Sequence, residues 1–303
     1  MKVVLFQIGD VTIYSYGLMI AIGMIAAVGI GCLRAKKYGL VSDTMFMGAV
    51  VGIVMGVIGG KLMYWLVEIK SIIQNPSIML NLGSGFVIYG GLLLGVLSPI
   101  FYFKKIKKTS ALAYLDIGIA SVALGQALGR VGCFMAGCCY GAEAPEGAWY
   151  AVYFPEGGYA PSGVGLYPTQ LMSAIGDLII MGVLMLLTNK AKFRGQMTSL
   201  YVILYSIGRF VLEFFRNDPR GEIGIFSTSQ FISFFTLAGG IALYFILRKK
   251  HILPLRRLSS LDPAVLEEDA APENGENREA ESKETLSGEV PETENEETED
   301  ENV

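Results

Sequence analysis

Charged residues and histidine are scarce in this chain, and both shortages restrict what it can be. Asp, Glu, Lys and Arg make up 17% of the 303 residues, whereas hydrophobic residues make up 52% and the mean hydropathy is +0.47. That composition excludes an ordinary soluble domain, in which about a quarter of the residues are charged. The sole histidine, His251, follows the last apolar run, and four cysteines are too few for a disulfide scaffold in a chain of this size.

Long apolar runs replace the missing charges. Residues 16–33 hold no charge and residues 44–67 hold one, Lys61, and each run is long enough to cross a bilayer core of about 30 Å as a helix. We therefore predict an all-α integral membrane protein with seven transmembrane helices, at about 14–33, 44–66, 85–103, 111–135, 168–188, 197–215 and 227–247. Glycines inside these runs favour close helix packing, although Gly83–Gly85 and Gly90-Gly91 could instead mark broken or re-entrant backbone.

The distribution of lysine and arginine predicts the orientation. Basic residues follow the first, third, fifth and seventh predicted spans, whereas residues 137–167 contain no lysine or arginine. Because cytoplasmic loops carry the excess of positive charge, we expect the N-terminus outside and the C-terminus in the cytoplasm.

The C-terminal segment differs in composition from everything before it. Residues 262–303 contain 17 acidic residues against two basic ones, a net charge of −15, so residues 1–261 carry +11. A segment this acidic and poor in aromatic residues cannot bury enough apolar surface to offset the entropy of ordering. We predict a membrane domain over residues 1–258 and an acidic, disordered cytoplasmic tail over residues 259–303.

Several unusual polar residues of the predicted spans lie towards the outer leaflet. At 100° per residue Tyr205, Arg209, Glu213 and Arg216 form one polar stripe on the sixth span, and Arg130 lies in the outer part of the fourth. The stripe could be an ion pair that fixes packing, with Arg216 extending to the interface. Arginines from two spans in one outer-leaflet pocket favour instead an anionic ligand, and in a membrane the obvious one is a phospholipid head group.

Three cysteines follow Arg130 closely, at positions 133, 138 and 139. A structural disulfide, or packing as small residues, is the simplest interpretation, and thiol exchange on the oxidising side is a second. Zinc binding is poorly supported, because there is no nearby histidine and adjacent cysteines are not the usual ligand spacing.

Five motifs, in order, resemble those of the bacterial prolipoprotein diacylglyceryl transferases. They are "YGLM" at 16–19, "YGGL" at 89–92, "GRVGCFMAGCCYG" at 129–141, "YPTQL" at 167–171 and "YSIGRFVLEFFR" at 205–216. The resemblance covers residues 10–247. Tyr89 and Tyr167 stand where the family commonly has histidine, and Cys133 stands where it has asparagine, so the chain is identified as a cysteine-rich variant.

The resemblance implies transfer of a diacylglyceryl group from phosphatidylglycerol to the lipobox cysteine of a preprolipoprotein signal peptide, at the outer leaflet of the bacterial plasma membrane. It implies catalytic roles for Arg130, Arg209, Glu213 and Tyr89, with the arginines holding the phosphate and Glu213 orienting Arg209 or accepting a proton. The substrate-binding residues implied are Tyr16, Gly129, Cys133, Gly141, Tyr205 and Arg216. No metal, cofactor or nucleic acid is implied; the partners are phosphatidylglycerol, the signal peptide and membrane lipid.

Three other classes of protein share some of these features. A lipid or anion transporter, or flippase, would also have intramembrane charge, but usually near the midplane and with an internal repeat, and we find none. A membrane thiol oxidoreductase would use Cys133, Cys138 and Cys139. A non-catalytic membrane interaction protein would have little use for buried arginines on two spans.

Overall fold

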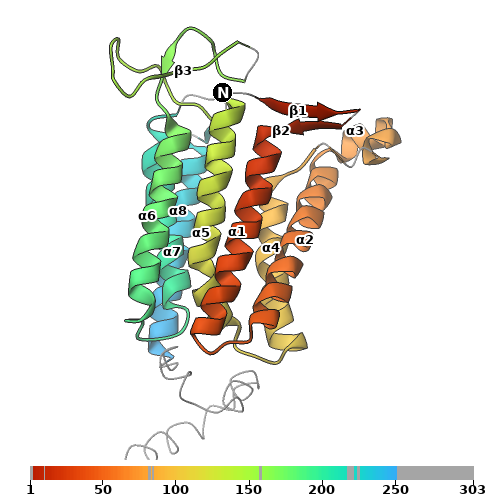
Figure 1. Ribbon diagram of the computed structural model, residues 1–303. Helices are drawn as coiled ribbons and strands as arrows, with labels where there is room; N and C mark the ends of the chain where they lie inside the picture. The colour runs from red at the N-terminus through yellow and green to blue at the C-terminus, as the bar shows by residue number, and fades with distance from the viewer. Residues whose placement is uncertain are drawn as a thin grey trace, which may run out of the picture. The chain divides into compact units, whose positions relative to one another are not determined.

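Long helices make up most of the structure, a computed structural model that describes residues 3–9, 11–80, 83, 85–156, 159–216, 222–223 and 226–250 (Figure 1). Among these residues five helices are long and apolar enough to cross a membrane. They are α1 (Ser15–Lys37), α2 (Ser42–Val67), α5 (Ala111–Ala136), α6 (Thr169–Thr188) and α8 (Thr228–Lys249). The prediction of a mostly helical protein with several membrane-spanning helices is confirmed. The predicted acidic tail lies outside the described residues.

The two remaining predicted spans correspond to shorter or more polar helices. The span expected at 85–103 is α4 (Ile88–Phe101), which contains Pro99 and continues as the π-helical segment η2 (Tyr102–Ile106). The span expected at 197–215 is α7 (Gln196–Glu213), whose 18 residues include Arg209 and Glu213. The total of seven spans stays a prediction.

Short elements connect the helices. The hairpin of β1 (Val4–Ile8) and β2 (Val11–Tyr14) precedes α1, and α3 (Ile69–Gln74) and the 3₁₀ helix η1 (Pro76–Leu80) follow α2. Two further antiparallel pairs are β3 (Val152–Tyr153) with β4 (Gly165–Leu166), and β5 (Glu222–Ile223) with β6 (Phe226–Ser227). Figure 1 shows the β1–β2 hairpin, α3 and β3 at the same end of the helices.

The helices pack mainly in pairs, α1 on α5, α2 on α4, α5 on α6 and α7 on α8 (Figure 1). Glycine permits the α2–α4 contact, because a Cβ atom on Gly59 would lie 2.3 Å from the carbonyl oxygen of Gly90. Gly90 therefore serves helix packing, the first of the two predicted alternatives. Large apolar side chains face outwards, with Ile25 73% and Leu186 77% exposed. Such a surface suits lipid rather than water.

α5 is the central helix and carries Arg130 and Cys133. In the most apolar 18-residue stretch of α5, 50% of the residues are buried, against 11% in the corresponding stretch of α1. At its other end the fully buried carboxylate of Asp116 accepts hydrogen bonds from the amides of Gly195 and Thr198, at 2.6 and 2.8 Å, and from the Thr198 hydroxyl at 2.7 Å. A negative group at a helix N-terminus is favourable, so this contact fixes the start of α7 against α5. It thereby sets the position of Arg209 relative to Arg130.

Candidate active site

One cavity is lined by three helices and contains both predicted phosphate-binding arginines. Its residues are Arg130 from α5, Ser173, Gly176, Asp177 and Ile180 from α6, and Tyr205, Gly208, Arg209 and Leu212 from α7. The cavity volume of about 30 Å³ accommodates a water molecule rather than a lipid head group.

Arg209 is held from two sides. Its Nη1 lies 2.7 Å from Oε2 of Glu213, one turn further along α7, and its Nη2 donates to the Ser229 hydroxyl of α8 at 2.8 Å. The other carboxylate oxygen of Glu213 accepts from the hydroxyl of Ser227 at 2.8 Å, and Ser227 is the N-cap of α8. The ion pair predicted from the i,i+4 spacing is therefore present, and it joins α7 to the start of α8.

Arg216 does not extend the polar stripe of α7. The helix ends at Glu213, and Arg216 instead forms an antiparallel bridge with Gly141. A Cβ atom on Gly141 would lie 2.6 Å from the carbonyl oxygen of Tyr167 and 2.7 Å from that of Phe215. Glycine at 141 is thus required for three chain segments to meet. The predicted continuation of the helical stripe to Arg216 was wrong, because α7 ends at Glu213.

Asp177 is the cavity residue that the sequence analysis missed. It is 5% exposed, and its charge interacts with that of Arg130 across the α5–α6 contact. The available signal was its isolation, since it is the only charged residue between Thr169 and Thr188. A charged residue within a membrane span marks a functional or pairing position by default.

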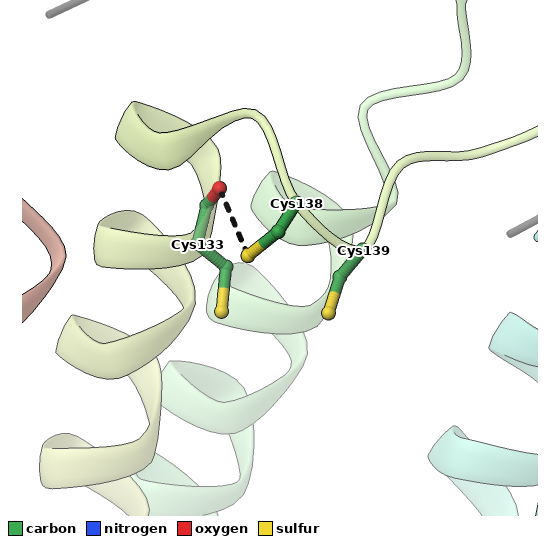
Figure 2. Close-up of side chains that lie close together, drawn as sticks. All are labelled: Cys133, Cys138 and Cys139. Carbon is green, nitrogen blue, oxygen red and sulfur yellow. Dashed lines mark hydrogen bonds between the residues drawn. The ribbon is translucent and has the colours of Figure 1, made fainter. Parts of the chain in front are cut away.

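The three cysteines converge at the end of α5. Their sulfur atoms all lie within 4.8 Å of one another, and none of them forms a disulfide (Figure 2). Gly137 ends the helix with a φ of 71°, and Cys139 also adopts a left-handed backbone, with a φ of 61°. Cys138 Sγ donates to the carbonyl oxygen of Cys133 at 3.7 Å. The turn after α5 thus brings the thiols of Cys138 and Cys139 beside that of Cys133, which lies in the last turn of the helix.

The start of α6 fixes this turn. The Thr169 hydroxyl donates to the carbonyl oxygen of Cys139, and the Gln170 side-chain amide donates to that of Cys138, each at 2.9 Å. Both donors are 1% exposed. Hydrogen bonds from the other two thiols, together with the Arg216 guanidinium, lower the pKa of Cys139.

Three other predicted site residues lie outside the cavity lining. Tyr16, 43% exposed, packs on α5 beside Gly132 and lies within electrostatic range of Cys133 and Arg130. Tyr89, 49% exposed, begins α4, which packs mainly on α2. Gly129 has no heavy atom within 4 Å of the position of an added Cβ. The structure therefore brings Arg130, Arg209, Glu213 and Tyr205 together, whereas the catalytic role of Tyr89 stays a prediction.

Apolar outer faces surround a cavity that is lined by two guanidinium groups and one carboxylate, as in a helical membrane protein. The model of the family described as prolipoprotein diacylglyceryl transferase matches residues 3–246. The chain is 48% identical over 244 residues to the phosphatidylglycerol–prolipoprotein diacylglyceryl transferase of Clostridium tetani, which covers 80% of this chain and 97% of the relative. It is 43% identical over 251 residues to phosphatidylglycerol–prolipoprotein diacylglyceryl transferase 2 of Clostridium perfringens, with 82% and 97% covered. The chain belongs to the prolipoprotein diacylglyceryl transferase family, as its motifs predicted.

Proposed function

We propose that this protein transfers the diacylglyceryl group of phosphatidylglycerol to the lipobox cysteine thiol of a preprolipoprotein. Membership of the family and the names of the two clostridial relatives support the reaction and both substrates. The observation that carries the proposal is the convergence of Arg130 and Arg209, from α5 and α7, on one cavity. Two guanidinium groups together suit a phosphate diester, which presents anionic oxygens to forked donors.

The proposed chemistry is a substitution at a glyceryl carbon. The sulfur of the peptide cysteine forms a bond to that carbon, the carbon–oxygen bond to the phosphate breaks, and glycerol phosphate leaves with the bonding electrons. The thiol proton is released to water, so the step balances in charge. Arg130 and Arg209 stabilise the negative charge that develops on the departing phosphate, and such stabilisation is strong where water is excluded.

Other residues in and around the cavity support the two arginines. Glu213 orients Arg209 through the 2.7 Å ion pair, and Tyr205, which lines the cavity, is positioned to hydrogen-bond the head group. Asp177 opposes the positive charge of Arg130 while no anion is bound. Tyr16, Cys133 and Arg216 lie around the end of α5, where the peptide thiol would approach. The proposed mechanism assigns no step to Tyr89, which lies in the first turn of α4.

The proposal includes seven spans in a bacterial plasma membrane, with the cavity towards the outer leaflet. Basic residues in the last turns of α1 and α8 support a cytoplasmic location for those ends. The absence of lysine and arginine from residues 137–167 supports an outer location for this segment. The segment begins with the cysteine turn and follows Arg130 closely in sequence, so we place the cavity towards the outer side as well. The domain predicted over residues 1–258 would carry the whole activity.

Mass spectrometry tests the proposed function. The purified full-length protein in detergent is incubated with phosphatidylglycerol and a synthetic lipobox peptide, and the peptide is expected to gain the mass of one diacylglyceryl group. Phosphatidylcholine and a peptide with serine in place of the cysteine serve as controls and should give no gain. A folded protein that leaves the peptide mass unchanged with phosphatidylglycerol would contradict the proposal.

A further inference from the structure

The cluster of Cys133, Cys138 and Cys139 has a geometry that the proposed transfer reaction does not require. The three sulfur atoms lie within 4.8 Å of one another (Figure 2). If all three sulfur atoms were 4.8 Å apart, an ion at the centre of their triangle would lie about 2.8 Å from each of them. Bonds between a metal ion and a thiolate sulfur are about 2.3 Å long. A contraction of about half an ångström per sulfur therefore converts the cluster into a three-coordinate sulfur site.

The turn that carries these sulfurs is held in place rather than loosely arranged. Cys139 adopts a φ of 61°, and left-handed backbone is uncommon for a residue with a side chain. The fully buried Thr169 and Gln170 hold the carbonyl groups of Cys139 and Cys138. A strained backbone persists only where its surroundings impose it, and such positions gather at functional sites.

The chemistry of the donors narrows the class of ligand. All three candidate ligand atoms are sulfur, and soft thiolates select monovalent copper or zinc over harder ions. A structural zinc ion takes four protein ligands, whereas this cluster supplies three. Three thiolates with one monovalent ion carry a charge of −2, and the guanidinium groups of Arg130 and Arg216, both within electrostatic range of Cys139, offset it.

We propose that Cys133, Cys138 and Cys139 form a binding site for one monovalent copper ion in three-coordinate sulfur geometry. Each thiol exchanges its S–H bond for an S–Cu bond, and the three protons pass to the solvent without any change of oxidation state. The site lies at the end of α5, one helical turn beyond Arg130, and is distinct from the cavity that contains Arg209.

Copper binding is measured on the purified full-length protein under anaerobic, reducing conditions, by competition with a chromogenic chelator of monovalent copper. We expect one tightly bound equivalent per chain, and X-ray absorption with three sulfur neighbours and no nitrogen or oxygen. The Cys138→Ala variant should bind at least about 100-fold more weakly, because removing a ligand costs more than the 10- to 100-fold typical of outer-shell partners. The Cys32→Ala variant is the matched control, since Cys32 lies on α1 with its thiol near the Ser42 carbonyl group, and it should bind as the unmodified protein does.

Gel filtration and the melting temperature establish that each variant is folded, and Cys138→Ser replaces Cys138→Ala if the latter is not. The proposal is overturned if the unmodified protein binds no copper, if it retains zinc in preference, or if the Cys138 variants bind copper as tightly as it does. It is also overturned if the three thiols are oxidised to a disulfide under these conditions and bind nothing.

The effect of copper on lipid transfer rests on the proposed function, and it is measured separately from copper binding. Copper at Cys133 and Cys139 would draw these residues together beside Arg130, so copper loading should reduce lipid transfer by the unmodified protein. For the Cys138→Ala variant the ratio of activities with and without copper should stay close to one. If no transfer is detected in any sample, the proposed function fails, while the binding measurement still decides the metal site.

Discussion

Replacing Glu213 with glutamine removes one charge from the contact that orients Arg209. The glutamine can still accept the hydrogen bond from Ser227, but its amide cannot replace the ion pair 2.7 Å from Nη1 of Arg209. Removing one partner of a buried pair costs about 3–5 kcal/mol, whereas exposed pairs are worth about 1 kcal/mol or less. The two side chains are 13% and 6% exposed, and one hydrogen bond survives, so we expect a loss of about 2–3 kcal/mol in the free energy of unfolding.

The same change should reduce lipid transfer without abolishing it. Arg209 keeps its charge and its bond to Ser229, but loses the contact that fixes its direction, and a displacement of about 1 Å in a catalytic group costs about 100-fold. We therefore expect a 10- to 100-fold fall in kcat/KM for Glu213→Gln, and a smaller fall for Glu213→Asp, which retains the charge.

Two measurements on one preparation decide this prediction. Thermal unfolding in detergent reports the stability, and the rate of peptide lipidation by mass spectrometry reports the activity. A Glu213→Gln protein as stable and as active as the unmodified one would refute the positioning role. A folded Glu213→Gln protein with no detectable activity, and with partial activity restored in Glu213→Asp, would make Glu213 the proton acceptor instead.

Two further substitutions test the backbone contacts that hold the helices around the site. Gly141→Ala should lower the free energy of unfolding by about 1–3 kcal/mol, because its Cβ would lie 2.6 Å from the Tyr167 carbonyl oxygen. Gly129→Ala, with open space around it, is the matched control and should leave the melting temperature unchanged or higher; equal melting temperatures for the two variants would contradict the packing account. Asp116→Asn should lower the free energy of unfolding by about 1.5–3 kcal/mol. The amide has only one acceptor oxygen, and its NH₂ group would face a backbone N–H donor at the start of α7. An unchanged denaturation midpoint for Asp116→Asn would show that this cap is not needed.

The sequence was sufficient to predict where the long helices lie and to which family the chain belongs. Runs without charge, such as residues 16–33, predict helices of the right length because a bilayer excludes unpaired backbone. The i,i+4 spacing of Arg209 and Glu213 predicted their ion pair, because that contact lies within one helix. The five motifs identified the family because they occur in the family's order, even though single residues in them, such as Tyr167, differ from the family's usual residues.

Two features that depend on contacts between distant segments could not be predicted. The position of Arg216, beyond the end of α7 at Glu213, includes a pairing with Gly141, which is 75 residues earlier in the chain. The convergence of the three thiols depends on hydrogen bonds from Thr169 and Gln170 and on the left-handed backbone of Cys139, none of which follows from spacing.

The most direct test of the central claim compares lipid transfer by Arg130→Ala and Arg209→Ala with transfer by Arg248→Ala, whose arginine lies in the last turn of α8, away from the cavity. Each protein is assayed in membranes with a lipobox peptide, and the diacylglyceryl-modified peptide is quantified by mass spectrometry. Loss of charge-assisted contacts to a phosphate predicts at least a 100-fold fall for each cavity variant and an unchanged rate for Arg248→Ala. Near-normal transfer by both folded cavity variants would contradict the account.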